Sequence, residues 1–263
     1  MSEFWIYLLS YALRQRIKAF PGVLKLRLLL LNRAARKQLV TDGTRICLEG
    51  FPRSGNGYSY ICVRDVLRIS GERVGHHTHS IANVKRAVKR GIPAFVLSRE
   101  PASCGISLVA WGACRTFEDA LRAYEQFYTA LLPLLAFVTI IPFECLVEEP
   151  HLFICRVAEQ LGMEAPVWNE AIARSVEEIA ERANRTLHGG NPLRASLPHI
   201  EKELSKIEIL KQPLAPEAAL LLERCRMLRT RILASAPDVV GNGVTTWVSH
   251  DNLLPGAQAR MAM

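Results

Sequence analysis

The chain has 263 residues, 49% of them hydrophobic and 22% charged, which excludes disorder, collagen and a coiled coil as descriptions of the whole chain. The net charge of +8 is unevenly spread, because residues 1–99 hold 18 Lys and Arg against 5 Asp and Glu. This excess indicates an anionic partner for the first third of the chain. Nine of these bases lie within residues 1–45, so an N-terminal arm shares the excess with any binding site.

The N-terminal segment is apolar over residues 4–13 apart from Ser10, and Arg14, Arg16 and Lys18 follow it. This run is about half of the roughly 20 residues that a membrane-spanning helix needs. A secretory signal is not predicted either, because the positive charges follow the apolar run and do not precede it. Two interpretations stay open: a helix packed on the domain, which we favour slightly, or contact with an anionic membrane surface through residues 1–20.

The predicted elements alternate between short apolar strands and helices. In chain order, strands are expected at residues 45–49, 74–79, 93–98 and 136–143, and helices at 58–69, 81–90, 101–112, 117–135, 149–161, 167–182 and 216–234. This alternation predicts an α/β fold, a three-layer α/β/α arrangement with a central parallel sheet.

No repeat or low-complexity linker divides the chain, so one domain is predicted. We expect a basic amphipathic arm over residues 1–40, a domain over 41–237 and a disordered tail over 238–263. The seven cysteines are an odd number without a C-x-x-C pair, and most have apolar neighbours. They are therefore expected to be core residues in a reducing compartment, which indicates a cytoplasmic location.

The most informative segment is a glycine-rich turn after the first predicted strand. It reads Gly50-Phe51-Pro52-Arg53-Ser54-Gly55-Asn56-Gly57-Tyr58. Such a turn before a helix gathers backbone N–H groups at the positive end of the helix dipole, where a phosphate or sulfate binds. The Walker A pattern is incomplete, since Asn56 stands where the phosphate-reaching lysine belongs. An anion-binding loop is favoured over an ATPase loop, with a turn that binds nothing as the other interpretation.

Three segments in order carry a resemblance to a known family. Residues 52–58 resemble the 5′-phosphosulfate loop, P-[KR]-S-G-[TNS]-T-[WY], of sulfotransferases that use 3′-phosphoadenosine 5′-phosphosulfate (PAPS). Residues 96–101, with Ser107 eight residues after Arg99, are similar to the family's 3′-phosphate motif. Residues 141–150 are a weaker match to its strand-to-helix junction. An arginine at a strand end and a hydroxyl on the next helix can converge on one phosphate.

The resemblance implies a P-loop-like fold and a transferase that moves a sulfuryl group from PAPS to the hydroxyl of a carbohydrate, a lipid or a small alcohol. The residues implied to bind the nucleotide are Arg53, Ser54, Gly55, Asn56, Gly57, Tyr58, Arg99 and Ser107. Arg53 is also implied to be catalytic, because it would stabilise charge on the transferring group. No metal and no nucleic-acid partner is expected.

The family also places a T-H pair about 20 residues before the 3′-phosphate arginine, and Thr78-His79 lies at that distance from Arg99. His79 is therefore implied to be the base that takes the acceptor proton. Because His76 and His77 are close by in the sequence, a metal site and an exposed histidine cluster stay open as alternatives. The metal site is disfavoured, since no Cys, Asp or Glu stands nearby to complete it.

Two departures from the family pattern leave other classes of function open. Gly57 replaces a threonine, and the basic loop that closes over the nucleotide has only residues 185–194 as a substitute. The alternatives are a P-loop kinase or nucleotide hydrolase, and a non-catalytic relative at the membrane periphery. The acceptor cannot be named from the sequence, because acceptor pockets are built from loops without motifs.

Overall fold

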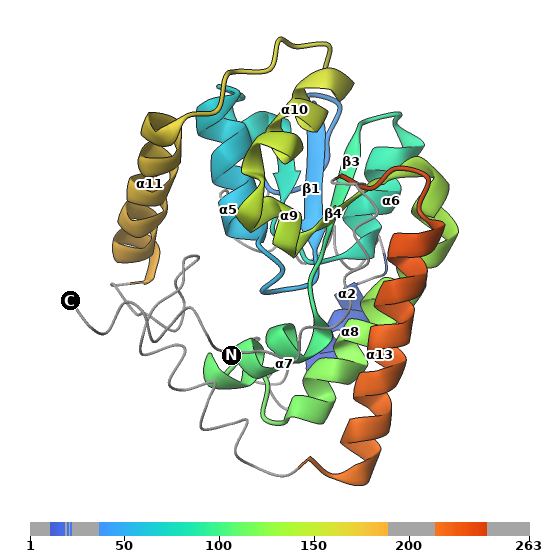
Figure 1. Cartoon of the computed structure of the whole chain (residues 1–263). Helices are drawn as coiled ribbons and strands as arrows, with labels where there is room; N and C mark the ends of the chain where they lie inside the picture. The colour runs from blue at the N-terminus through green and yellow to red at the C-terminus, as the bar shows by residue number, and fades with distance from the viewer. Residues whose placement is uncertain (1–10, 19, 21, 23–36, 189–213, 241–263) are drawn as a thin grey trace, which may run out of the picture.

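A computed structural model describes residues 11–18, 20, 22, 37–188 and 214–240. Within them, four parallel strands form one sheet in the order β2-β1-β3-β4, with helices on both faces (Figure 1). The strands are β1 (Ile46–Gly50), β2 (Val74–His76), β3 (Ala94–Ser98) and β4 (Thr139–Pro142). The predicted α/β class with a central parallel sheet is confirmed.

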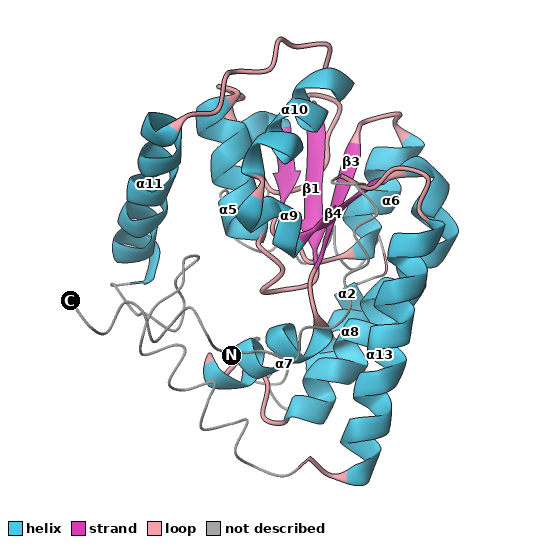
Figure 2. Ribbon diagram, viewed as in Figure 1, coloured by secondary structure: helices cyan, strands magenta, loops and turns pink. Residues whose placement is uncertain are grey.

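The sheet is covered on both sides because successive residues of each strand enter two different apolar clusters. Cys47 and Val96 belong to one cluster, and Leu48 and Leu97 to the other. The first cluster receives α2 (Tyr11–Lys18), α6 (Ile81–Lys89), α7 (Pro101–Ala110), α8 (Phe117–Leu131) and α13 (Pro216–Ser235). The second receives α5 (Asn56–Ile61), α9 (Phe143–Glu148), α10 (Pro150–Gln160) and α11 (Glu170–His188), so three layers result (Figure 2).

The order of the strands reverses direction at β1. The chain goes from β1 to β2 on one side and then returns to place β3 on the other side of β1. The connecting helix changes face accordingly, from α5 to α6, as right-handed crossovers require. Open parallel sheets bind their ligands beyond the carboxyl ends of the strands at such a reversal. The ends of β1 and β3 are therefore the first place to look for a site.

Local signals explain where several helices begin. The Ser80 and Thr116 side chains accept hydrogen bonds from the first turns of α6 and α8, and α7, α10 and α13 each begin with a proline.

Two predicted strands are shorter than expected. β2 ends at His76 because His77 and His79 have φ angles of 53° and 49°, and a 3-10 helix (Leu132–Phe137) occupies the start of the last predicted strand.

The described part of the N-terminal arm packs on the domain. The backbone N–H groups of Tyr11 and Ala12 donate to the Asp119 carboxylate of α8, at 2.5 and 3.1 Å, and both residues are buried. This contact agrees with the favoured interpretation for residues 11–18, while residues 1–10 lie outside the described residues. Across the described ranges, every helix is too short or too polar to span a membrane.

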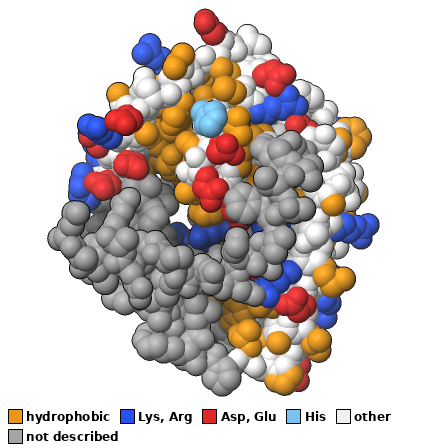
Figure 3. Space-filling view, in the orientation of Figure 1, with side chains coloured by type: hydrophobic (Ala, Val, Ile, Leu, Met, Phe, Trp, Pro, Cys, Tyr) orange, Lys and Arg blue, Asp and Glu red, His pale blue; other side chains and the backbone are white. Residues whose placement is uncertain are grey.

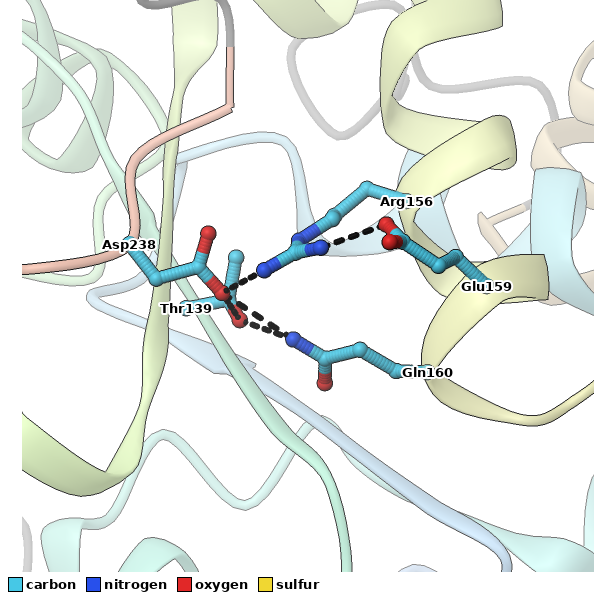
Figure 4. Close-up of polar contacts among 5 residues, drawn as sticks. All are labelled: Thr139, Arg156, Glu159, Gln160 and Asp238. Carbon is cyan, nitrogen blue, oxygen red and sulfur yellow. Dashed lines mark hydrogen bonds and ion pairs between the residues drawn. The ribbon is translucent and has the colours of Figure 1, made fainter.

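The segment after α13 returns to the free edge of β4. Ile140 N–H donates to the Asp238 carbonyl at 2.9 Å, and Val240 N–H donates to the Ile140 carbonyl at 3.0 Å. The Asp238 carboxylate accepts hydrogen bonds from the side chains of Thr139, Arg156 and Gln160 (Figure 4). The start of the predicted tail is thus held against the sheet, and residues 241–263 lie outside the described residues.

Candidate functional site

The glycine-rich turn connects β1 to α5 as predicted. Ser54 N–H and the Asn56 side-chain amide both donate to the Phe51 carbonyl, at 3.1 and 3.0 Å, and close the turn. Gly55 has a φ of 96°, and a Cβ atom there would lie 2.8 Å from Leu146 Cδ2. Glycine is needed at this position both for the left-handed backbone and for the close approach of α9.

Two arginines and a serine from separate parts of the chain meet at the ends of β1 and β3. Arg53 Nε donates to Ser107 Oγ at 2.8 Å, and Arg99 Nη1 donates to the Arg53 carbonyl at 2.9 Å. Burial, followed by the neighbouring charge of Arg99, lowers the pKa of Arg53 to about 10. The electrostatic potential around Arg53 and Arg99, at the ends of β1 and β3, is therefore positive. Figure 3 shows Lys and Arg side chains near the centre of the face that is seen in Figure 1.

Aromatic residues hold both guanidinium groups in position. Arg53 lies over the Trp111 ring, 5.7 Å from its centroid, and Arg99 lies over the Phe143 ring at 3.9 Å. The Tyr124 hydroxyl donates to the Arg99 carbonyl at 2.8 Å. These three aromatics were not predicted, because they come from α8, α9 and the position directly after α7 and carry no motif of their own.

The other predicted residues of the loop serve mainly to shape it. Ser54 is fully buried with its hydroxyl 3.6 Å from Cys104 Sγ, and the buried Asn56 Oδ1 atom has no partner among the described residues. Gly57 and Tyr58 are half-buried. Burial raises the pKa of the Tyr58 hydroxyl, and its ring packs against the second apolar cluster. The first backbone hydrogen bond of α5 runs from Ser59 N–H to the Gly55 carbonyl, so the N–H groups of Asn56, Gly57 and Tyr58 in the first turn are the ones that a helix start offers to an anion.

His79 lies next to the glycine-rich turn. Its Nδ1 atom is 3.0 Å from the Gly50 carbonyl, and its backbone N–H donates to Glu49 Oε2 at 2.9 Å. A carbonyl can only accept, so Nδ1 carries the hydrogen and the lone pair of the neutral ring is on Nε2. The His79 ring thus has the tautomer that a base needs.

The two neighbouring histidines have a different environment. His76 stacks on Tyr60 with ring centroids 3.9 Å apart, and its Nδ1 atom is 2.6 Å from Nδ1 of His77. Burial lowers the pKa of His76 to about 2 and that of His77 to about 4, so both are neutral near pH 7. His77 and His79 do not share a strand face, because the strand ends at His76. In the ranges that the structure describes, no group of three or more His, Cys, Asp or Glu could hold a metal ion.

A pocket of about 620 Å³ lies beside His79, between α2, α6 and α8. Its lining is mixed: Phe51, Ile81 and Phe127 are apolar, while Gln15 and Gln126 have amide side chains. A pocket of this size and mixed character is typical of small-molecule sites.

The structure brings together Arg53, Arg99 and Ser107 from three separate segments, and it places His79 against the Gly50 carbonyl at the start of the glycine-rich turn. The substitute for the closing loop begins at the end of α11, and residues 189–194 lie outside the described residues. Sequence reasoning missed Glu49, although a carboxylate within a buried strand was a visible signal. The chain matches no family model, no curated protein and no solved structure.

Proposed function

We propose that the chain is a sulfotransferase that moves a sulfuryl group from PAPS to an acceptor hydroxyl. The observation that carries this proposal is the contact between the two phosphate motifs, in which Arg53 bonds to Ser107 and Arg99 bonds to the Arg53 carbonyl. These residues are distant in sequence and meet at the reversal of strand order. Two guanidinium groups held side by side favour an anion with more than one phosphate.

The proposed nucleotide site has two parts, and different residues form each part. Ser107 Oγ accepts from Arg53 and still has its hydrogen to donate, so Ser107 and Arg99 suit the 3′-phosphate. The backbone N–H groups at the start of α5 suit the 5′-phosphosulfate, together with the Arg53 guanidinium. A bound anion would relieve the repulsion between Arg53 and Arg99.

In the transfer step, the acceptor oxygen forms a bond to sulfur as the bond between sulfur and the bridging phosphate oxygen breaks. The acceptor proton goes to Nε2 of His79, and 3′-phosphoadenosine 5′-phosphate (PAP) leaves with the electron pair of the broken bond. Arg53 stabilises the charge that develops on the leaving oxygen and the sulfuryl group. The pocket beside His79 is the place for the acceptor, whose class is a carbohydrate, a lipid or a small alcohol.

The proposal is tested by incubating a small-molecule cell extract with the full chain and PAPS. We expect one or more compounds to gain the mass of a single sulfuryl group. His79→Ala should abolish this transfer and leave PAP affinity within about twofold, whereas Arg53→Ala should lower both. His77→Ala is the matched control, because it removes a neighbouring ring that has no proposed role.

Three results would contradict the proposal in different ways. Transfer that survives in His79→Ala but not in His77→Ala would move the base to the neighbouring ring. Hydrolysis of ATP with magnesium would favour the kinase or nucleotide hydrolase class. Binding of PAP without transfer in any extract would favour a relative that has lost its activity.

A further inference from the structure

The Glu49 side chain is fully buried at the end of β1 and accepts hydrogen bonds from four donors. Oε1 accepts from Thr78 N–H at 3.1 Å, from Thr78 Oγ1 at 2.6 Å and from Asn83 Nδ2 at 2.9 Å, while Oε2 accepts from His79 N–H at 2.9 Å. Three of the four donors belong to the segment that carries the proposed base.

A carboxylate at this position needs an explanation beyond packing. The neighbouring residues of β1 are apolar or small, and a buried carboxyl group is unfavourable without compensating hydrogen bonds. Burial raises the pKa of Glu49 to about 7 in spite of the four hydrogen bonds, which act in the opposite direction. An apolar side chain would fill the same space without the unfavourable free energy of burying a carboxyl group. The role of the carboxylate is therefore to hold the groups that donate hydrogen bonds to it.

Glu49 and Gly50 together hold His79 at two points. Glu49 Oε2 binds its backbone N–H, and the next carbonyl along β1 accepts from its ring Nδ1. His79 has a φ of 49°, a left-handed conformation that is unfavourable for a residue with a Cβ atom. The hydrogen bonds to Glu49 offset that strain and keep the ring against Gly50.

We propose that Glu49 is a positioning residue for His79, fixing the backbone of the Thr78–His79 segment so that the ring keeps its Nδ1–H tautomer against the Gly50 carbonyl. The catalytic meaning of this inference rests on the proposed function, while the orientation of the ring does not. Glu49 itself would touch neither nucleotide nor acceptor.

The test is the Glu49→Gln variant of the full chain, whose side-chain amide keeps the shape but replaces one accepting oxygen with a donor. Nitrogen-15 NMR of the histidine rings should show His79 protonated at Nδ1 in the wild type and a mixture of tautomers in the variant. Turnover of PAPS with an extract acceptor should fall at least tenfold, and PAP affinity should stay within about twofold.

Thr139→Val is the matched control. It removes a buried hydroxyl from the hydrogen-bond network at the other end of the sheet, so it should lower the melting temperature without changing the His79 spectrum. Thr78→Val serves if Glu49→Gln does not fold, because it removes only the hydrogen bond from the Thr78 hydroxyl to Oε1 and keeps the other three to the Glu49 carboxylate. A smaller change of the same kind is expected from it.

An unchanged His79 tautomer and unchanged turnover in a folded Glu49→Gln or Thr78→Val variant would overturn the inference. So would equal spectral changes in Thr139→Val, since these would indicate a general loss of structure. A wild-type chain that neither binds PAP nor transfers sulfate would contradict the proposed function instead. In that case the tautomer measurement still decides whether Glu49 orients His79.

Discussion

Backbone strain is concentrated at the candidate site. Among the described residues, four that are not glycine have positive φ angles, and three of them are Arg53, His77 and His79. Such conformations persist only where surrounding contacts determine them, and they cluster at functional sites. Arg53 is fixed through its carbonyl by Arg99, and His79 through its N–H by Glu49. Two of the four strained residues, Arg53 and His79, are thus ones whose side chains have proposed roles.

Gly55→Ala should destabilise the chain more than a matched glycine replacement does. Gly91→Ala is the control, since Gly91 also has a positive φ, 64°, but has no atom within 4 Å of its Cβ position. It should cost about 1–2 kcal/mol for the left-handed backbone alone. Gly55→Ala should cost about 1–3 kcal/mol more, because Leu146 must move. Urea unfolding measures the loss of stability in both variants. Equal losses would contradict the close approach of α9 to Gly55.

The lowered pKa values of His76 and His77 predict that acid destabilises the fold. Their folded-state pKa values, about 2 and about 4, lie below the ordinary value of 6.5, so the unfolded chain binds protons that the folded chain excludes as the pH falls from 6.5 to 4. Glu49 has the opposite effect on the free energy of unfolding, because its pKa of about 7 lets the folded chain bind a proton between pH 4.5 and 7 that the unfolded chain does not bind. Two histidines outweigh one carboxyl group, so the free energy of unfolding should decrease toward pH 4.

His77→Gln should reduce this acid dependence by roughly 2–3 kcal/mol between pH 6.5 and pH 4, as measured by urea unfolding across the range. His151→Gln, which changes an exposed histidine on α10, should leave it unaltered. The same slope in both variants would mean that His77 is charged in the folded chain.

At the scale of elements, α2 depends on α8 for its first turn. The Asp119 carboxylate accepts from the backbone N–H groups of Tyr11 and Ala12, as a capping side chain does. The partner lies more than 100 residues away, so this cap has no local signal. By contrast, the caps and prolines of α6, α7 and α8 are adjacent in sequence to the helices that they begin, and the predicted starts of these helices were close to those observed.

Asp119→Ala should lower stability by about 0.5–2 kcal/mol, as loss of a helix cap does, when unfolding is followed by circular dichroism. Glu118→Ala is the control, because its neighbouring carboxylate makes a surface ion pair with Arg122 and should matter less. In a chain lacking residues 1–20, Asp119→Ala should have little further effect. A helix that lies on membranes would instead leave stability unchanged on deletion and lose binding to anionic vesicles.

At the scale of the whole molecule, the sequence predicts the three layers but not which segments lie next to each other in the sheet. Most residues of the buried parallel strands are apolar, with exceptions such as Glu49 and Thr139, so their number and class were predicted from short apolar runs that alternate with helices. The position of β3 beside β1 has no local signal, because it depends on which edge the α6 connection reaches. The return of Asp238 to β4 is likewise a contact between residues 99 positions apart. Motif spacing predicts roles for Arg53, His79 and Arg99, while the contacts of Trp111 and Phe143 with the two arginines are visible only in the assembled fold.

The most direct measurement is a calorimetric titration of the full chain with PAP, compared with adenosine 5′-phosphosulfate, which lacks the 3′-phosphate. PAP should bind, and Arg99→Ala should weaken it at least tenfold, because a charge-assisted pair is worth about 1.5–3 kcal/mol. The same variant should barely change the affinity for adenosine 5′-phosphosulfate. Arg90→Ala, which removes a surface arginine paired with Asp42, is the control and should leave both affinities unchanged. Absence of PAP binding, or equal losses for the two nucleotides in Arg99→Ala, would contradict the account.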